Sequence, residues 1–155
     1  MLEIELEIKK ADVYEEVAKT TAYIGGKNVD ANGKSLYDQV FVTNEDKKMI
    51  DRFWIEAAGM VTNAAKRFIT SVSDVSVDDS ANYVLNLFMS DRYDHNLTGS
   101  ISSSMFSFFV SYIIAKWCEI VSKDSAREYS DNAVAMLAGV KEKLFYKSRP
   151  KRIKI

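Results

Sequence analysis

The 155-residue sequence contains one cysteine, one histidine and one proline. One cysteine cannot form a disulfide within the chain, and one cysteine with one histidine cannot supply a Cys/His zinc site. The first ten residues, MLEIELEIKK, are charged throughout and unlike a secretory signal. Because no uninterrupted apolar run reaches the roughly 18 residues that span a bilayer, we expect no membrane segment and no membrane partner.

The composition is that of an ordinary soluble globular domain, with 47% hydrophobic and 28% charged residues and a net charge of −1. A chain of this length buries roughly two-thirds of its unfolded surface, so a core can form without disulfides or metals. We expect one mainly helical domain over residues 1–147, followed by a basic C-terminal arm over residues 148–155.

Two segments show the alternation of a β-strand. Residues 2–8 (LEIELEI) alternate strictly between apolar side chains and glutamates, which is typical of a strand with one solvent-facing side. Residues 82–89 also alternate, but the segment is short enough that a helix remains open. The turn residues on both flanks favour a strand. We predict a small antiparallel sheet formed by residues 2–9 and about 82–89.

Two helices are predicted in the N-terminal half. The first covers residues 11–24 and is expected to stop at Gly25-Gly26, ahead of a long loop over residues 25–42. The second is expected to begin with Thr43 and Asp46 in an approximate capping box. Its apolar residues recur at helical spacing: Met49, Ile50, Phe53, Trp54, Ala57, Val61, Ala64, Phe68 and Ile69. Residues 71–80 read as an exposed connection.

Two further helices are predicted in the C-terminal half. Their apolar stripes are Ile101, Met105, Phe108, Phe109, Tyr112, Ile113, Trp117 and Ile120, and then Ala126, Tyr129, Ala133, Met136, Leu137, Val140 and Leu144. The short SKDS link (122–125) implies an antiparallel αα-hairpin, and Pro150 is expected to end the last helix. The predicted fold is therefore α+β and mainly helical, with about four helices.

The candidate chemical motifs are weak. NGKS (32–35) resembles the end of a phosphate-binding loop, but Asn28 stands where that motif requires its first glycine. Asp91, Asp94 and His95 are close in sequence but match no metal-ligand spacing. Cys118 lies in an apolar helix and is expected to be a small buried hydrophobe. We therefore predict no catalytic residue, no cofactor and no metal site.

Charge is distributed unevenly along the chain. The last fifteen residues, KEKLFYKSRPKRIKI, carry seven Lys or Arg and one Glu, a net of +6, whereas the preceding 140 residues have a net of −7. Such a tail suits an acidic protein surface, such as Glu3, Glu5 and Glu7 of a neighbouring copy, or the phosphates of a nucleic acid. Its final residues, Arg152 to Ile155, alternate and could add to a sheet edge.

Three segments give the chain a resemblance to a known family: the helix EDKKMIDRFWIEAAGMVTNAAKRFI, the strand-like YVLNLFMS and the hairpin from Leu97 to Tyr146 followed by a basic arm. In layout they resemble the head–tail connector (adaptor or neck) proteins of tailed bacteriophages. The clear N-terminal strand departs from the mostly helical layout of connectors.

The resemblance implies a non-enzymatic virion protein, assembled in the host cytoplasm. Its copies would form a ring, usually of twelve, that joins the portal to other tail or neck proteins and surrounds the channel through which DNA passes without specific binding. The arm and the long loop would make these contacts. The residues expected to bind partners are Lys27, Lys34, Tyr37, Lys147, Arg149, Lys151, Arg152, Ile153, Lys154 and Ile155. The alternative is a small nucleic-acid-binding module that uses the same arm.

Overall fold

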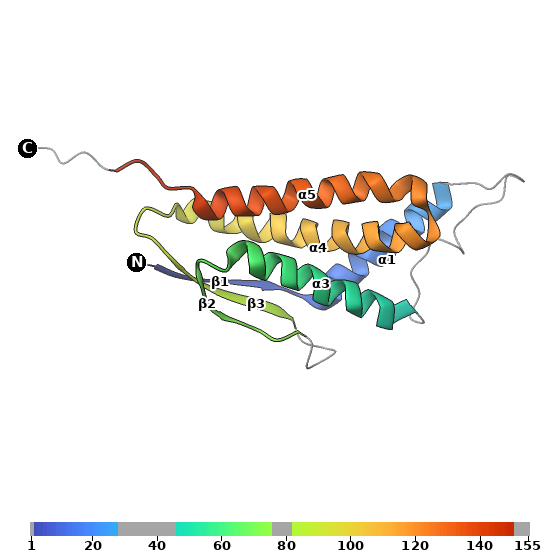
Figure 1. The fold of residues 1–155 in the computed structure, drawn as a ribbon, viewed down its shortest axis with the longest axis horizontal. Coiled ribbons are helices and arrows are strands. Elements are labelled where there is room, and N and C mark those ends of the chain that lie inside the picture. Colours follow the sequence, from blue (N-terminus) through green and yellow to red (C-terminus); the bar gives the residue numbers. More distant parts are fainter. Residues whose placement is uncertain (1, 28–45, 76–81, 151–155) are drawn as a thin grey trace, which may run out of the picture.

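A computed structural model describes residues 2–27, 46–75 and 82–150. Its elements, in chain order, are β1 (Leu2–Ile8), α1 (Lys10–Lys27), α3 (Lys47–Ala65), β2 (Ile69–Val72), β3 (Tyr83–Met89), a short 3₁₀ turn η2 (His95–Leu97), α4 (Thr98–Val121) and α5 (Lys123–Phe145). Figure 1 shows helices stacked above a small sheet. The predicted α+β, mainly helical class with a C-terminal αα-hairpin is confirmed.

The sheet has three antiparallel strands in the order β1-β3-β2. Leu2 pairs with Met89 and Ile8 with Tyr83, so the predicted strand at residues 82–89 and its pairing with the N-terminal strand are confirmed. The apolar side chains of β1 and β3 that alternate inward are buried under the helices, whereas the glutamates of β1 face solvent. Alternation therefore fixed both the strand assignment and the face that forms the core.

The third strand, β2, corrects the sequence-based prediction. The second helix ends at Ala65, where the backbone N–H of Phe68 bonds the Ala65 carbonyl at 2.9 Å. Ile69 then starts a strand that pairs with β3, so the helix does not reach residue 69, and residues 71 and 72 are strand rather than connection. The β-branched residues of this segment (ITSV) favour the extended backbone once β3 offers an edge.

The first helix is also longer than predicted, since α1 continues through Gly25-Gly26 to Lys27. Glycine within a helix costs about 1 kcal/mol relative to alanine, which does not by itself end a helix. Of the two residues in the predicted capping box, the structure describes only Asp46. Asp46 is the N-cap of α3, but its side chain makes no capping hydrogen bond. Thr43 lies outside the described residues.

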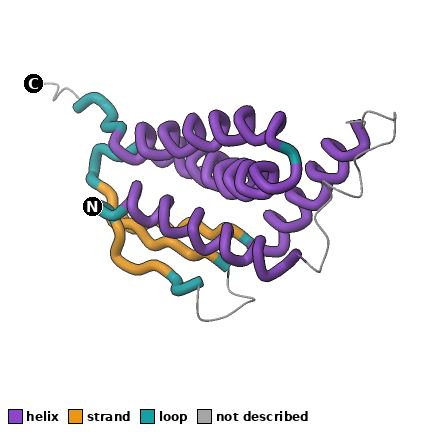
Figure 2. Tube along the Cα trace, turned by 45° about the vertical axis from the view of Figure 1, so that its right-hand side comes forward, coloured by secondary structure: helices purple, strands orange, loops and turns teal. Residues whose placement is uncertain are grey.

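The αα-hairpin occupies the top of the molecule, with α4 in the middle of the helical layer (Figures 1 and 2). The link between α4 and α5 is Ser122 alone, shorter than the predicted SKDS, and its backbone N–H bonds the Cys118 carbonyl at 2.8 Å. Three residues of the predicted apolar stripes lie outward instead: Met49, Ile120 and Met136 are 42%, 57% and 37% exposed.

By length and composition, the segment His95–Val121 is sufficient to cross a membrane, with a mean hydropathy of 1.4. The segment is not the uninterrupted apolar run that the sequence expectation concerned, because serines, Lys116 and Glu119 interrupt its apolar residues. In the fold this helix has ten buried residues, including Ile101, Phe109 and Ile113, and it packs against α5, α3, α1 and β1. It is the central helix of the core.

Candidate interaction site at the C-terminal arm

The C-terminal arm leaves the body where α5 ends, at Phe145. Tyr146 already has extended backbone, with φ −65° and ψ 134°. The helix thus stops five residues before Pro150, and the prediction that this proline ends it is wrong. Beyond the helix, the start of the arm is held by another part of the molecule.

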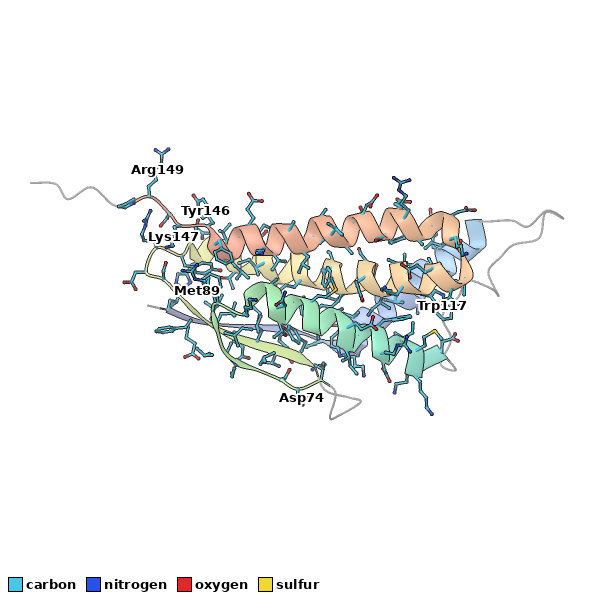
Figure 3. The ribbon with its side chains drawn as sticks, viewed as in Figure 1. Asp74, Met89, Trp117, Tyr146, Lys147 and Arg149 are labelled. Atoms are coloured by element: carbon cyan, nitrogen blue, oxygen red, sulfur yellow. The ribbon has the colours of Figure 1, made fainter. Side chains whose placement is uncertain are left out.

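Ser148 and Arg92 form that attachment. The backbone N–H and the hydroxyl of Ser148 donate to the Arg92 carbonyl at 2.8 and 2.9 Å, and Arg92 Nε donates to the Ser148 carbonyl at 2.9 Å. Arg92 lies between β3 and η2. We refer to these three bonds as the Ser148–Arg92 clasp. It fixes the start of the arm beside the end of β3, and Figure 3 shows Arg149 projecting away from the body.

Aromatic and basic side chains surround the start of the arm. The Phe68 and Phe145 rings meet edge-on at 5.0 Å, and the Arg67 guanidinium lies 5.9 Å from the centre of the Phe145 ring. A hollow of about 280 Å³ there is lined by Arg67, Phe68, Phe88, Met89, Ser90, Tyr93, Leu144, Phe145, Tyr146 and Lys147. Phe88, Phe145 and Tyr146 are each about half exposed. Arg67 and Phe88 were not predicted from the sequence, because only the fold brings them to the arm.

The residues predicted to bind partners do not form one cluster. Lys147 and Arg149 lie at the end of the molecule from which the arm leaves. Lys27 is the last residue of α1, whose end lies at the opposite end of the molecule (Figure 1). Lys34, Tyr37 and residues 151–155 lie outside the described part of the chain. Lys27 and the start of the arm therefore lie at opposite ends of the body.

A second surface lies along the outer edge of β1. Within the described residues this strand pairs with β3 alone, and its three glutamates are exposed. Among these glutamates, Glu7 accepts a hydrogen bond from Asn82 Nδ2 at 3.2 Å. The result is an acidic strip on an edge strand, as the sequence alternation implied.

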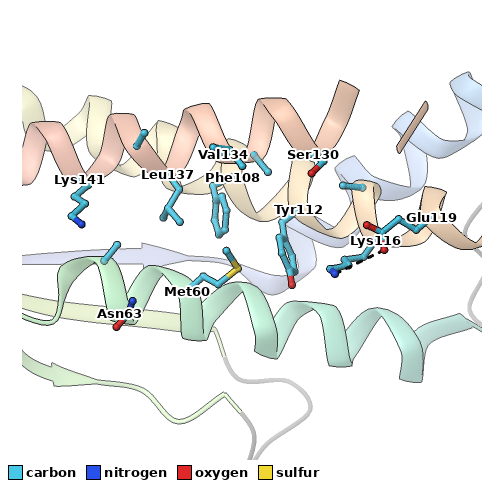
Figure 4. A pocket seen from close by; sticks show the side chains of 14 residues that line it. Met60, Asn63, Phe108, Tyr112, Lys116, Glu119, Ser130, Val134, Leu137 and Lys141 are labelled. Atoms are coloured by element: carbon cyan, nitrogen blue, oxygen red, sulfur yellow. Dashed lines mark ion pairs between the residues drawn. The ribbon is translucent and has the colours of Figure 1, made fainter. Parts of the chain in front are cut away.

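A third surface is a groove of about 490 Å³ between α3 and α5, floored by α4 (Figure 4). Its floor includes Phe108 and Tyr112, and Met60 and Val134 stand exposed at its sides. Burial, and then a hydrogen bond of 3.0 Å to Glu56, raises the pKa of Tyr112 to about 12, so its hydroxyl stays protonated at neutral pH. No local pattern in the sequence indicated this groove, because it depends on how the helices are spaced.

The remaining candidates have structural roles where the structure describes them. The Asp94 carboxylate accepts from the Asn96 backbone N–H at 2.9 Å and so caps the turn that begins at His95. Within residues 2–27, 46–75 and 82–150 no three His, Cys, Asp or Glu side chains gather as a metal site would require. Cys118 is buried, which raises its pKa to about 11. NGKS lies outside the described residues.

No protein-family model, no curated protein and no solved structure matches this chain.

Proposed function

We propose that this protein is a non-enzymatic virion subunit, a ring-forming head–tail connector or adaptor that joins the portal to the tail of a bacteriophage and surrounds the DNA exit channel. Its work is assembly. Each copy uses its C-terminal arm to contact neighbouring copies, the portal or the next tail protein. The layout of helices, sheet and basic arm supports the family, and the arm supports the mechanism.

The observation that carries the proposal is that the base of the arm is held at Ser148 and that Arg149, just after it, projects away from the body. The Ser148–Arg92 clasp orients the arm, and the residues that follow it are strongly basic. An arm that packed on its own domain would not need to be aimed outward. One that must find a partner gains from a fixed starting point, because less freedom is lost on binding.

The charge distribution agrees with a subunit of a DNA channel. The first 140 residues carry a net charge of −7. An acidic wall does not hold the phosphates of passing DNA, whereas the basic arm attracts an acidic surface of a partner.

Deletion of residues 148–155 tests the proposal. We expect the shortened chain to keep its helical circular dichroism and its cooperative unfolding, and to lose assembly in sedimentation velocity. A control chain in which residues 151–155 are replaced by five alternating Gly and Ser residues keeps the clasp and should also fail to assemble. Undiminished assembly by either chain would contradict the role of the arm. Portal, capsid and tail genes beside this reading frame would support the family, and their absence would count against it.

A second candidate function, nucleic-acid binding, is favoured by the side chains at the base of the arm. Arg67, Arg92 and Lys147 lie there with half-exposed aromatic rings. Cations that contact phosphates, combined with aromatic rings that stack on bases, form the usual single-strand binding surface.

Salt dependence separates the two functions. Phosphate contacts would make DNA affinity fall by about one power of salt concentration for each phosphate neutralised. Retention of single-stranded DNA at low salt that is lost in the chain lacking residues 148–155 would support this second function. No retention at low salt would remove it.

A further inference from the structure

The outer edge of β1 has the features of a site for an added strand. β1 is seven residues long and occupies one side of the three-stranded sheet. A strand in that position directs alternate backbone N–H and C=O groups away from its partner, where another chain can bond them. Its side chains alternate as well: Glu3 and Glu5 are exposed on one face, whereas Ile4 and Leu6 are buried on the other.

There is open space beside the C-terminal end of β1. A hollow of about 440 Å³ separates the end of β1 and the start of α1 from the first turns of α4, and it is lined by Glu7, Ile8, Lys9, Asp12, Gly99, Ser102, Ser103 and Phe106. The α4 residues that face it are mostly small. Ser103 is exposed, and Ser102 and Phe106 are half-buried, so large side chains do not close the gap.

We propose that residues 151–155 of one copy add as an extra strand to the outer edge of β1 in a neighbouring copy. Residues directly opposite each other in a sheet share a face. A strand of Arg152-Ile153-Lys154-Ile155 can therefore place both cations beside the exposed glutamates and both isoleucines on the side of the core and the α4 hollow. This inference rests on the proposed function, since it names the surface that receives the arm.

The direction of the arm favours a neighbouring copy over its own. The arm leaves at the end of the molecule where β1 begins, while β1 runs back along the body (Figure 1). To reach its own β1 edge, the chain would have to reverse direction directly after the Ser148–Arg92 clasp. Pro150 disfavours the helical region for Arg149, so the backbone before it is biased toward the extended course in which residues 146–149 leave the body. A contact between two different surfaces of identical copies closes into a ring if the rotation permits.

The first test exchanges the charges on both surfaces of the full chain. We expect Glu3→Lys with Glu5→Lys to abolish assembly in sedimentation velocity, and Arg152→Glu with Lys154→Glu to do the same. The chain that carries all four substitutions should assemble again. Glu7 is left unchanged because it bonds Asn82. Glu16→Lys, an exposed charge reversal on α1, is the control and should leave assembly intact.

The second test measures the contact without assembly. The receptor is the full chain carrying Arg152→Glu and Lys154→Glu, and the probe is a fluorescein-labelled peptide of residues 149–155. We expect a rise in fluorescence anisotropy, with affinity lowered at least about tenfold by Glu3→Lys and Glu5→Lys in the receptor. A peptide of the same composition in an order without alternation should bind at least about tenfold more weakly. No binding, or equal binding of both peptides, would overturn the proposal.

Backbone methylation distinguishes strand addition from simple charge attraction. An added strand bonds β1 through alternate N–H groups, so N-methylation at Ile153 and at Lys154 should affect binding very unequally. Equal affinity of the two methylated peptides would overturn strand pairing.

The site and the function can also fail separately. If deletion of residues 148–155 abolishes assembly but the β1 substitutions do not, the arm binds elsewhere and the proposed function stands. A disulfide within one chain, rather than between chains, in the Glu5→Cys, Lys154→Cys variant would overturn the neighbouring copy as the partner.

Discussion

The ammonium group of Lys10 lies 3.1 Å from the Asp51 carboxylate, and both side chains are largely shielded from solvent. The pair joins the first residue of α1 to α3. The Tyr14 hydroxyl also donates to Asp51, and the Lys10 backbone N–H bonds the side chain of Asn82 at 3.0 Å. This network connects helix, helix and sheet at the point where the chain leaves β1.

Breaking the Lys10–Asp51 pair on one side should be costly. We expect Asp51→Ala to lower the free energy of unfolding by about 3 kcal/mol, because it leaves a shielded ammonium and the Tyr14 hydroxyl without this acceptor. The double variant Lys10→Met, Asp51→Ala should lose less than the sum of the single losses. Urea unfolding followed by circular dichroism measures both. Glu15→Gln, in the exposed pair with Lys19, should leave stability unchanged, and strict additivity of the two buried substitutions would contradict the coupling.

Removing the clasp should free the arm without unfolding the domain. Arg92→Ala removes the bond from Nε, and Ser148→Pro removes the two bonds donated by Ser148. Hydrogen exchange should become faster at Tyr146, Lys147 and Arg149 in both variants, and more so in Ser148→Pro, while exchange within α4 stays slow. The exposed Arg127→Ala on α5 is the control. Unaltered exchange at Tyr146 and Lys147 would show that the clasp does not hold the arm in solution.

Alkaline pH should destabilise the fold. Burial raises the pKa of Tyr83 to about 12 against its hydrogen bond with Thr62, and burial raises the pKa of Cys118 to about 11. The native state therefore keeps these protons after the unfolded chain has lost them, from about pH 9 for a thiol and pH 10 for a phenol. The associated stability is complete below those values and is lost as pH rises to about 11 and 12.

The urea midpoint, measured from pH 8 upward, tests this direction. Cys118→Ala removes the thiol with its raised pKa. The urea midpoint should therefore fall less steeply between about pH 9 and pH 11 in this variant. The same burial should make Cys118 unreactive toward a disulfide reagent at pH 8 until urea is added. A midpoint that stays level or rises through this range, or fast reaction of the native thiol, would contradict the expected burial.

Trp54 should tolerate phenylalanine better than alanine. Its side chain is fully buried, with its ring 4.6 Å from that of Phe109, but its indole N–H has no hydrogen-bond partner among the described residues. Trp54→Phe removes an unsatisfied donor and keeps most of the packing, so we expect it to lower the free energy of unfolding by about 1 kcal/mol. Trp54→Ala should lower it by roughly 3–5 kcal/mol. Similar losses in urea unfolding for the two variants would show that the indole N–H is needed.

Local patterns predicted the parts of the fold that depend on local sequence. The strict alternation of residues 2–8 and the spacing of Phe109 and Ile113 each require one type of element, and the structure has them. Ile69 was assigned to a helix because it continues the apolar spacing. It lies in β2 instead because β3 provides a bonding edge, and that edge is distant in sequence. Gly25 was read as a stop, although its cost to a helix is small.

The candidate site was only partly visible in the sequence for the same reason. Charge counts identified Lys147 and Arg149, since basic residues are concentrated in the last fifteen positions. Arg92 and Phe88 belong to segments more than 50 residues earlier, and nothing local marks them as neighbours of the arm. The groove over Tyr112 is a property of three helices together, so no single stripe of residues predicted it.

The near-equal lengths of the two hairpin helices determine where the arm emerges. α4 has 24 residues and α5 has 23, and a single serine joins them, so the chain travels about 36 Å out and about 35 Å back. The difference in length between the two helices therefore sets the position of Ser148 relative to Arg92. One extra turn in α5 alone would carry Ser148 about 5 Å past Arg92 and separate the two. Insertions of equal length in both helices would leave Ser148 beside Arg92. The two helix lengths must therefore change together if the start of the arm is to keep its position.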